Sequence, residues 1–298
     1  MVVSGYNIIE LCGSDRMTIS IKPFDAALGA DITGVNLAND ISPETFQIIH
    51  HAWLEHMVLV FPGQSLDEEE QIRFAKLWGE FPRRDRYDSR AEKDTADKSI
   101  MLVSNVRDTN GMPIGSLPDG EMMFHSDGAY DRHPYRYTML YAVELPSEGG
   151  NTLFANLCKA YDALPDRLKV RLSTCTALQE YYSGTVMRGQ NIGEKNGSFA
   201  HPVITAHEET SKPVLFISRL ITVAIPELSS DEQIETLEFL FKHTEKQEFI
   251  YEHHWSLGDF VMWDNRCVNH ARRDFPSTQR RLLRRNVIQG TQPKRATI

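Results

Sequence analysis

Cysteine is scarce in this chain, and its scarcity excludes one large class of proteins. Four cysteines occur among 298 residues, namely Cys12, Cys158, Cys175 and Cys267, and no two of them form a CxxC pair. Small secreted domains depend on closely spaced cysteines, whereas a long chain with few cysteines usually keeps them reduced. We therefore predict free thiols and a cytoplasmic location.

Long hydrophobic runs and an excess of positive charge are also missing. No apolar stretch approaches the roughly 20 residues that a membrane-spanning helix requires. Residues 1–16 lack the basic and apolar segments of a secretory leader. Lys and Arg number 32 against 41 Asp and Glu, and the resulting net charge of −9 disfavours contact with a phosphate backbone. We expect neither a membrane nor a nucleic acid as a partner.

The composition is instead that of one globular unit. Hydrophobic residues make up 41% of the chain, which is enough for a single large core. We interpret residues 17–298 as one domain and residues 1–16 as an N-terminal extension, with Met17 as an alternative start. Residues 182–198 are polar and rich in Gly and Asn, as is typical of a loop. Because long loops in compact domains often cover functional sites, we predict a lid there.

Short strands dominate the expected secondary structure. Seven strand-like runs are visible, at residues 58–61, 100–106, 137–145, 152–155, 214–218, 260–263 and 282–288. Capping residues predict three helices, beginning at Ser42 with Pro43, at Ser65 with Glu68, and at Ser230 with Gln233. Many short strands with turn-rich connections favour a sandwich or barrel over alternating strands and helices. We predict a mainly β fold with flanking helices.

A His-x-Asp pair is the first candidate for chemistry. The segment FHSDGAY carries His125 and Asp127. On an extended strand, residues i and i+2 point the same way and lie about 6.6 Å apart, so both side chains can reach one metal ion. An imidazole nitrogen and a carboxylate oxygen suit Fe(II), and a second histidine would complete a facial triad that leaves three metal positions open. A simple His–Asp hydrogen bond explains the pair equally well.

The third ligand must come from elsewhere in the chain. In WDNRCVNH, an apolar run delivers His270 past a turn, which makes His270 the best candidate. A half-buried structural histidine is the alternative interpretation. His207 and Glu209 form a rival His-x-Glu pair, but their hydrophilic surroundings indicate a solvated loop.

Arginines crowd the segment after His270, although the net charge of the protein is negative. On a strand, Arg281, Leu283, Arg285 and Val287 share one face. An arginine that faces the interior requires an anion, because an unpaired buried charge costs several kcal/mol. The Cα atoms of Arg281 and Arg285 would lie about 13 Å apart, which fits two anionic groups better than one carboxylate.

Taken together, these residues resemble the taurine dioxygenase-like (TauD/TfdA) family of Fe(II)- and 2-oxoglutarate-dependent dioxygenases. The resemblance runs from about Lys22 to Gly290. The matching blocks, in order, are LGADITGVNL, VLVFPGQ, FHSDGAY, GGNTLFAN, WDNRCVNH and RRLLRRNVIQG. Membership would imply a double-stranded β-helix, or jelly roll, and a homodimer or homotetramer.

The resemblance also implies roles for individual residues. His125, Asp127 and His270 would be the catalytic iron ligands. Arg281 would pair with the distal carboxylate of 2-oxoglutarate, and Thr152 would add a hydroxyl to it. The reaction would use O2 to hydroxylate an aliphatic C–H bond and release succinate and CO2, with carbon–heteroatom cleavage where the hydroxylated carbon is unstable.

The substrate side is less defined by sequence. Arg285 would lie between the cosubstrate and a small anionic substrate. Glu121 stands where taurine enzymes carry an amide, so the resemblance does not indicate taurine as the substrate. The side chain of Glu121 is either a substrate contact or a solvated carboxylate. Phe124 and Tyr130 would line the cavity or fill the core. Arg83, Arg84 and Arg86 form either an anion site or a charged surface loop.

Two alternative functions fit part of the pattern. A zinc-dependent hydrolase on a jelly roll could use the same His/Asp/His set, with a bound water as nucleophile. It would not need Arg281 or 2-oxoglutarate. A non-catalytic jelly-roll module that binds a small acid would keep His125 and Asp127 only as a hydrogen-bonded pair. Turnover without O2 would indicate the hydrolase, and a missing metal would indicate the binding module.

Overall fold

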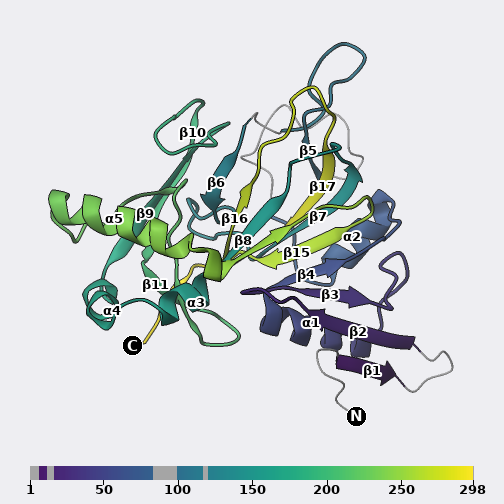
Figure 1. Cartoon of the computed structure of the whole chain (residues 1–298), viewed down its shortest axis with the longest axis horizontal. Coiled ribbons are helices and arrows are strands. Elements are labelled where there is room, and N and C mark those ends of the chain that lie inside the picture. The colour runs from purple at the N-terminus through teal and green to yellow at the C-terminus, as the bar shows by residue number, and fades with distance from the viewer. Residues whose placement is uncertain (1–6, 12–16, 83–98, 117–119, 298) are drawn as a thin grey trace.

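The computed structural model describes residues 7–11, 17–82, 99–116 and 120–297 (Figure 1). The arginines at positions 83, 84 and 86 lie outside the described residues. Part of the expected N-terminal extension is a strand, because β1 (Asn7–Leu11) pairs antiparallel with β2 (Met17–Pro23). The division of the chain at residue 17 stays a prediction.

Two facing sheets form the centre of the molecule. The larger sheet has the order β1, β2, β3 (Ala30–Thr33), β4 (Val58–Phe61), β15 (Phe260–Asp264), β7 (Tyr137–Glu144), β17 (Leu282–Ile288), β5 (Met101–Ser104). The smaller sheet has the order β14 (Ile250–His253), β8 (Thr152–Asn156), β16 (Val268–Arg272), β6 (Met122–His125). The pairing is antiparallel throughout both sheets except between β3 and β4. The protein is therefore mainly β, as the sequence predicts.

Further short strands lie beside this core. One three-stranded sheet has the order β10 (Lys195–Pro202), β9 (Thr176–Tyr182), β13 (Thr222–Ala224), and another has the order β12 (Pro213–Leu215), β11 (Ile204–Ala206), β18 (Lys294–Arg295). The helices are α1 (Pro43–His56), α2 (Glu68–Lys76), α3 (Leu157–Asp162), α4 (Asp166–Leu172) and α5 (Ser230–Thr244), with a 3₁₀ turn at Gln247–Phe249. Figure 1 places α1 and α2 on one side of the molecule and α4, α5 and β9–β10 on the other.

Local sequence explains where the helices begin. The side chain of Ser42 accepts a hydrogen bond from the backbone N–H of Thr45, and Pro43 opens α1, as predicted. The predicted capping box of α2 is wrong by two residues, because Asp67 and Glu70 form it rather than Ser65 and Glu68. Helix α5 is likewise capped by Ser229, one residue before the predicted Ser230. Overlapping capping patterns in adjacent polar residues account for both shifts.

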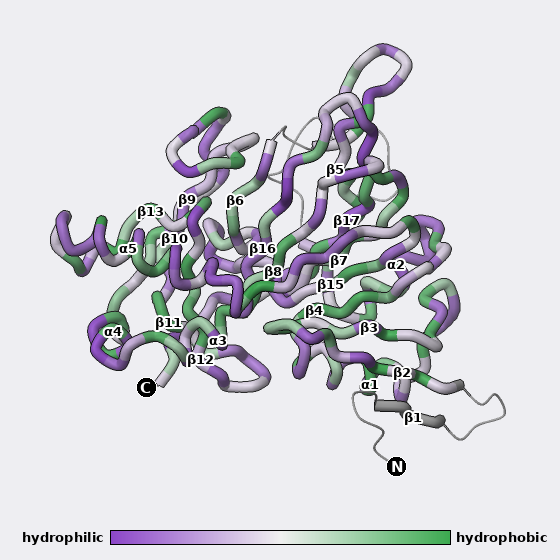
Figure 2. The backbone as a smooth tube through the Cα atoms, viewed as in Figure 1, coloured by the Kyte–Doolittle hydropathy of each residue, from purple (hydrophilic) through white to green (hydrophobic). Residues whose placement is uncertain are grey.

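The hydrophobic core has two layers, one on each face of the larger sheet. The cluster between the two sheets includes Val60, Leu140 and Val261 of the larger sheet and Phe154 of the smaller sheet. The outer layer packs against α1 and α2. In Figure 2 the hydrophobic colour concentrates along β4 and β15, the strands that are buried on both faces.

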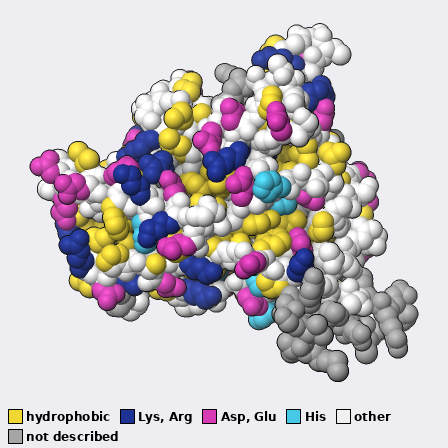
Figure 3. Space-filling view, in the orientation of Figure 1, with side chains coloured by type: hydrophobic (Ala, Val, Ile, Leu, Met, Phe, Trp, Pro, Cys, Tyr) yellow, Lys and Arg dark blue, Asp and Glu magenta, His cyan; other side chains and the backbone are white. Residues whose placement is uncertain are grey.

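The surface is mixed in character. On the face seen in Figure 3, basic and acidic side chains are interspersed. Among the described helices, none is both long and apolar enough to cross a membrane.

Candidate metal centre

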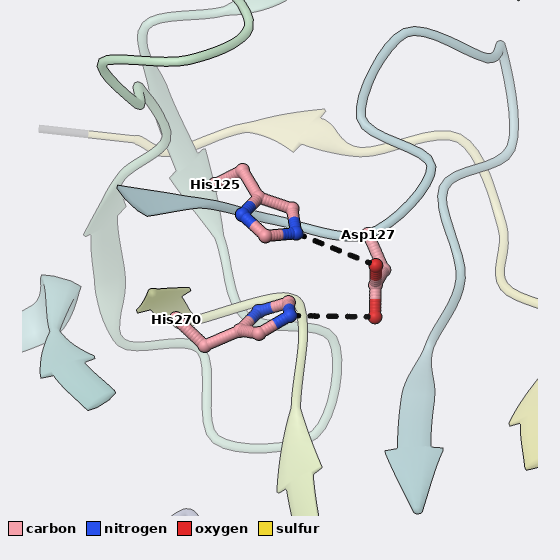
Figure 4. A group of neighbouring side chains, drawn as sticks. All are labelled: His125, Asp127 and His270. Carbon is pink, nitrogen blue, oxygen red and sulfur yellow. Dashed lines mark ion pairs between the residues drawn. The ribbon is translucent and has the colours of Figure 1, made fainter. Parts of the chain in front are cut away.

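Two histidines meet at the inner side of the smaller sheet. His125 ends β6, and His270 lies on the neighbouring strand β16, directly opposite it in the strand register. Their ring centroids lie 4.1 Å apart. Since side chains of directly paired residues lie on the same face of a sheet, the two rings lie side by side, and both point toward Asp127 (Figure 4).

Asp127 completes the group from a different local structure than expected. Strand β6 ends at His125, so Asp127 lies in the following turn and not on an extended strand, which corrects the predicted i, i+2 geometry. Its Oδ1 lies 3.8 Å from Nε2 of His125, and its Oδ2 lies 3.9 Å from Nε2 of His270. These distances are too long for hydrogen bonds. One ligand atom from each residue lies within 4.8 Å of the others, which leaves room for an ion between them.

Hydrogen bonding and burial prepare the histidines as ligands. Nδ1 of His125 lies 2.9 Å from the backbone carbonyl of Met123. A carbonyl can only accept, so Nδ1 carries the proton and the Nε2 lone pair is free for a metal. Burial lowers the pKa of His125 and lowers that of His270 further, with like charges adding to the effect, so both rings are neutral near pH 7. Two neutral imidazoles together with a carboxylate oxygen form a donor set that fits Fe(II).

The carboxylate of Asp127 is ionised despite its burial. Burial alone would raise its pKa, but Arg285 and the two histidines hold the pKa well below its ordinary range. Nη2 of Arg285 lies 2.7 Å from Oδ1 of Asp127. Arg285 lies on the inner face of β17, as predicted, together with Leu283, which packs in the core between the sheets.

Arg281 is a buried cation without a carboxylate partner. Only 1% of its surface is exposed, and within the described chain no Asp or Glu oxygen lies within 4.0 Å of its guanidinium. Nη2 donates to the carbonyl of Gly150 at 3.0 Å, and Nε has no hydrogen-bond partner among the described residues. Burial, together with the nearby charge of Arg272, lowers its pKa to about 9. A small dicarboxylate such as 2-oxoglutarate fits this site because it would neutralise the guanidinium.

Thr152 is buried on β8 near this arginine. Thr152 pairs with Arg272 of β16. Gly150, two residues before Thr152, accepts the hydrogen bond from Arg281 through its carbonyl. The hydroxyl of Thr152 accepts a hydrogen bond from the indole N–H of Trp255 at 3.0 Å. Because that oxygen already accepts, its own proton remains available to an anion.

The structure does not bring every predicted substrate residue to the centre. Phe124 packs on the opposite face of the smaller sheet, in a cluster with Leu153 and Ala155, because adjacent strand residues alternate between faces. Glu121 is exposed and pairs with Arg273 at 3.0 Å. Neither position supports a contact with the substrate.

An aromatic pair borders the centre instead. Tyr130 is buried and stacks on Tyr181 of β9, with ring centroids 5.2 Å apart. Burial raises the pKa of Tyr181; the charge of Asp127 raises it further, and that of Arg285 lowers it. Tyr181 lies in no sequence motif, and only its packing against Tyr130 from another part of the chain identifies it.

The predicted lid has more regular structure than expected. Tyr182 ends β9 and residues 195–198 belong to β10, so the connecting loop covers only residues 183–194. This loop lies against β6, where the N–H of Met123 donates to the carbonyl of Val186 at 3.0 Å. Whether the loop acts as a lid stays a prediction.

The interpretation of His207 as part of a solvated loop is wrong. His207 is 4% exposed, and its Nε2 lies 2.8 Å from Oδ2 of Asp264. Asp264 also binds Arg266 through both of its oxygens. His207, Asp264 and Cys267 are close enough to hold a metal, but these hydrogen bonds already occupy the polar atoms of the first two residues. The group therefore supports the fold.

Comparison with known proteins decides the family. Residues 20–286 match the profile of the family described as "Taurine catabolism dioxygenase TauD, TfdA family". The chain belongs to this family.

Individual relatives are similar to this chain over nearly its whole length. An (S)-phenoxypropionate/alpha-ketoglutarate-dioxygenase of Sphingobium herbicidovorans is 33% identical over 91% of this chain and 94% of that protein. An alpha-ketoglutarate-dependent 2,4-dichlorophenoxyacetate dioxygenase of Cupriavidus pinatubonensis is 30% identical over 90% of this chain and 97% of that protein. The crystal structure of a taurine dioxygenase from Burkholderia xenovorans superposes with a TM-score of 0.77, at 25% identity and 92% coverage of both chains.

These matches confirm the predicted family and the jelly-roll core. The protein is an Fe(II)- and 2-oxoglutarate-dependent dioxygenase that uses O2 and acts on a small molecule. The zinc-dependent hydrolase and the non-catalytic binding module are not favoured.

Proposed function

We propose that His125, Asp127 and His270 hold the Fe(II) of this dioxygenase. The observation that carries this assignment is the convergence of two imidazoles and one carboxylate, with their ligand atoms within 4.8 Å of one another. His125 and Asp127 are buried, and the His270 side chain is 13% exposed. A facial set of this kind leaves three metal positions open to cosubstrate and O2. The metal and 2-oxoglutarate together supply oxidative decarboxylation and the hydroxylation of a C–H bond.

The cosubstrate would be bound at the buried arginine. Arg281 would donate to the distal carboxylate of 2-oxoglutarate, and Thr152 would add its hydroxyl proton. Two features support this role: Arg281 is buried, and its Nε has no hydrogen-bond partner in the described part of the chain. A guanidinium in a dry pocket binds a carboxylate strongly because water does not compete for either charge.

The substrate would be a small organic anion with an apolar body. Arg285 offers a positive charge beside the proposed iron position, and the stacked Tyr130 and Tyr181 offer an apolar wall. Phenoxypropionate in the name of one relative combines a carboxylate with an aromatic ring and an ether oxygen. Hydroxylation of a carbon next to such a heteroatom would give an unstable product that fragments.

The remaining expectations are also part of this proposal. We place the enzyme in the cytoplasm as a homodimer or homotetramer, without a nucleic acid or a membrane as partner. The net charge of −9 and the mixed surface support the last point.

Succinate release tests this function directly. The purified protein is incubated with Fe(II), 2-oxoglutarate, O2 and a panel of aryloxyalkanoates, sulfonates and alkyl sulfates. We expect succinate in stoichiometric amounts with oxidised substrate, and none when O2 is removed. Turnover in the absence of O2, or no succinate with any acid of the panel, would contradict the proposal.

A further inference from the structure

The outer hydrogen bonds of Asp127 indicate a positioning residue that no motif marks. Thr138 lies on β7, is fully buried, and donates its hydroxyl proton to Oδ2 of Asp127 at 2.6 Å. We propose that Thr138, held in turn by Asn265 and Trp263, fixes the orientation of the Asp127 carboxylate for metal binding. The inference rests on the proposed ligand set.

The direction of every hydrogen bond in this chain of contacts is determined. Trp263 can only donate, and its Nε1 lies 3.0 Å from Oδ1 of Asn265. Oδ1 is therefore the acceptor end of the amide, and Nδ2 donates to Oγ1 of Thr138 at 2.8 Å. Because Oγ1 of Thr138 receives that proton, its own hydroxyl proton is directed to the ionised Asp127. Such chains of buried hydrogen bonds strengthen one another and restrict each member to one rotamer.

The hydrogen bond between Thr138 and Asp127 also joins the two sheets at the proposed metal position. His125 and His270 both belong to the smaller sheet, whereas Thr138 lies on the larger sheet, where it pairs with Trp263 on β15 and Val287 on β17. Asp127 extends from the turn after β6 toward the larger sheet. The Thr138 hydroxyl therefore fixes the distance between the carboxylate and the two imidazoles across the interior.

Asn265 restrains the same turn from a second direction. The N–H of Asp127 lies 3.4 Å from Oδ1 of Asn265, and the hydroxyl of Ser126 donates to the Asn265 carbonyl at 2.7 Å. Asn265 is fully buried, so water does not compete for these bonds. Backbone and side chain of Asp127 are thus held by one residue pair, Asn265 and Thr138.

Metal affinity measures this role without turnover. Mn(II) is titrated into the wild type, Thr138→Val and Thr138→Ser, and the free ion is followed by electron paramagnetic resonance. Loss of an outer hydrogen bond to a ligand usually weakens metal binding about 10- to 100-fold, so we expect Thr138→Val to raise the dissociation constant by at least about tenfold. Thr138→Ser keeps the hydroxyl and should stay within about twofold of the wild type.

A second threonine provides the matched control. Thr244 is equally buried and its hydroxyl donates to helix carbonyls of α5, so Thr244→Val makes the same chemical change away from the centre. Circular dichroism and thermal unfolding of the metal-free proteins show whether each variant folds. Thr138→Ala replaces Thr138→Val if the valine is not accommodated. The absorption spectrum of bound Co(II), which depends on ligand geometry, should change in Thr138→Val and not in Thr244→Val.

The outcomes separate this inference from the function on which it rests. If the wild type binds Mn(II) and a folded Thr138→Val binds it equally tightly with an unchanged Co(II) spectrum, the positioning role is wrong. If the wild type binds no Mn(II) at the three proposed ligands, the ligand assignment itself is wrong and the inference fails with it.

Discussion

Arg285 and Asp127 form an ion pair at the point where the two sheets face each other, with Nη2 of Arg285 2.7 Å from Oδ1 of Asp127. The pair links the proposed metal ligand to the residue expected to meet the substrate anion. Arg285 has further donors, since a guanidinium carries five N–H groups. It can therefore keep its contact with Asp127 and bind a second anion at the same time.

Replacing Arg285 should change the preference for charged substrates. In the wild type we expect the free acid of an accepted substrate to be preferred over its methyl ester. Arg285→Met should reduce that preference about 10- to 100-fold, because a hydrogen bond to a charged group contributes about 1.5–3 kcal/mol. The measurement is the ratio of kcat/KM for acid and ester. An unchanged ratio would show that Arg285 does not meet the substrate anion.

Replacing Arg281 should weaken the binding of 2-oxoglutarate and leave the metal in place. Loss of one partner from a buried charge pair costs about 2–5 kcal/mol, so Arg281→Met should raise the KM for 2-oxoglutarate at least about 30-fold. Arg280 is the matched control, since it is adjacent but exposed and paired with Glu144 at 2.7 Å. Equal effects of Arg281→Met and Arg280→Met on this KM would contradict the assignment.

Tyr181 should contribute to binding of the organic substrate only. Tyr181→Ala removes the ring that stacks on Tyr130, so we expect the KM of that substrate to rise about tenfold, a change of about 1.4 kcal/mol. Tyr181→Phe keeps the ring and should resemble the wild type. Isothermal titration with 2-oxoglutarate provides the second readout. Weaker cosubstrate binding in Tyr181→Ala would place the ring at the wrong subsite.

The buried group around Asp264 should make stability depend on acid pH. Burial alone would raise the pKa of Asp264, but Arg266 and His207 lower it below the ordinary value of 3.8. A carboxyl whose pKa is lower in the folded state stabilises the fold fully above that ordinary, unfolded value and loses this contribution as the pH falls toward the folded value.

Asp264→Asn therefore has a defined pH profile. At pH 7 it should lower the free energy of unfolding by about 2 kcal/mol, because it weakens the buried charged hydrogen bonds of Asp264 to His207 and Arg266, although Arg266 keeps Glu209 at 2.9 Å. The difference from the wild type should shrink below about pH 4. Urea unfolding at several pH values measures this difference in the free energy of unfolding. Asp166→Asn is the control, because the Asp166 side chain is 98% exposed. A difference that is constant down to pH 2 would show that ionisation of Asp264 contributes nothing.

Much of the fold could be predicted from the sequence because it depends on local patterns. Short strand-like runs in the sequence predicted β4 and β17 to the residue, and Ser42 with Pro43 predicted the start of α1. Capping boxes proved less precise, since several polar residues in succession can serve as the cap. The turn at Asp127 was also not visible, because strand periodicity does not show where a strand ends.

The candidate site was only partly predictable, for a related reason. His125, Asp127, His270 and Arg281 lie in recognisable motifs, and the structure brings the first three together. Thr138 and Tyr181 lie in no motif, and their roles depend on side-chain contacts with residues elsewhere in the chain, Asp127 and Tyr130 respectively. The local sequence around His207 indicates a solvated loop because the partner that buries it, Asp264, comes 57 residues later.

Metal binding by the wild type and by His125→Ala tests the central claim most directly. The metal content is measured after anaerobic loading with Fe(II) and removal of excess ion, with the exposed His133→Ala as the control. We predict about one iron per chain in the wild type and in His133→Ala, and less than about one tenth of that in His125→Ala, because the two remaining ligands cannot hold Fe(II) tightly. An iron content in folded His125→Ala equal to that of the wild type would contradict the account.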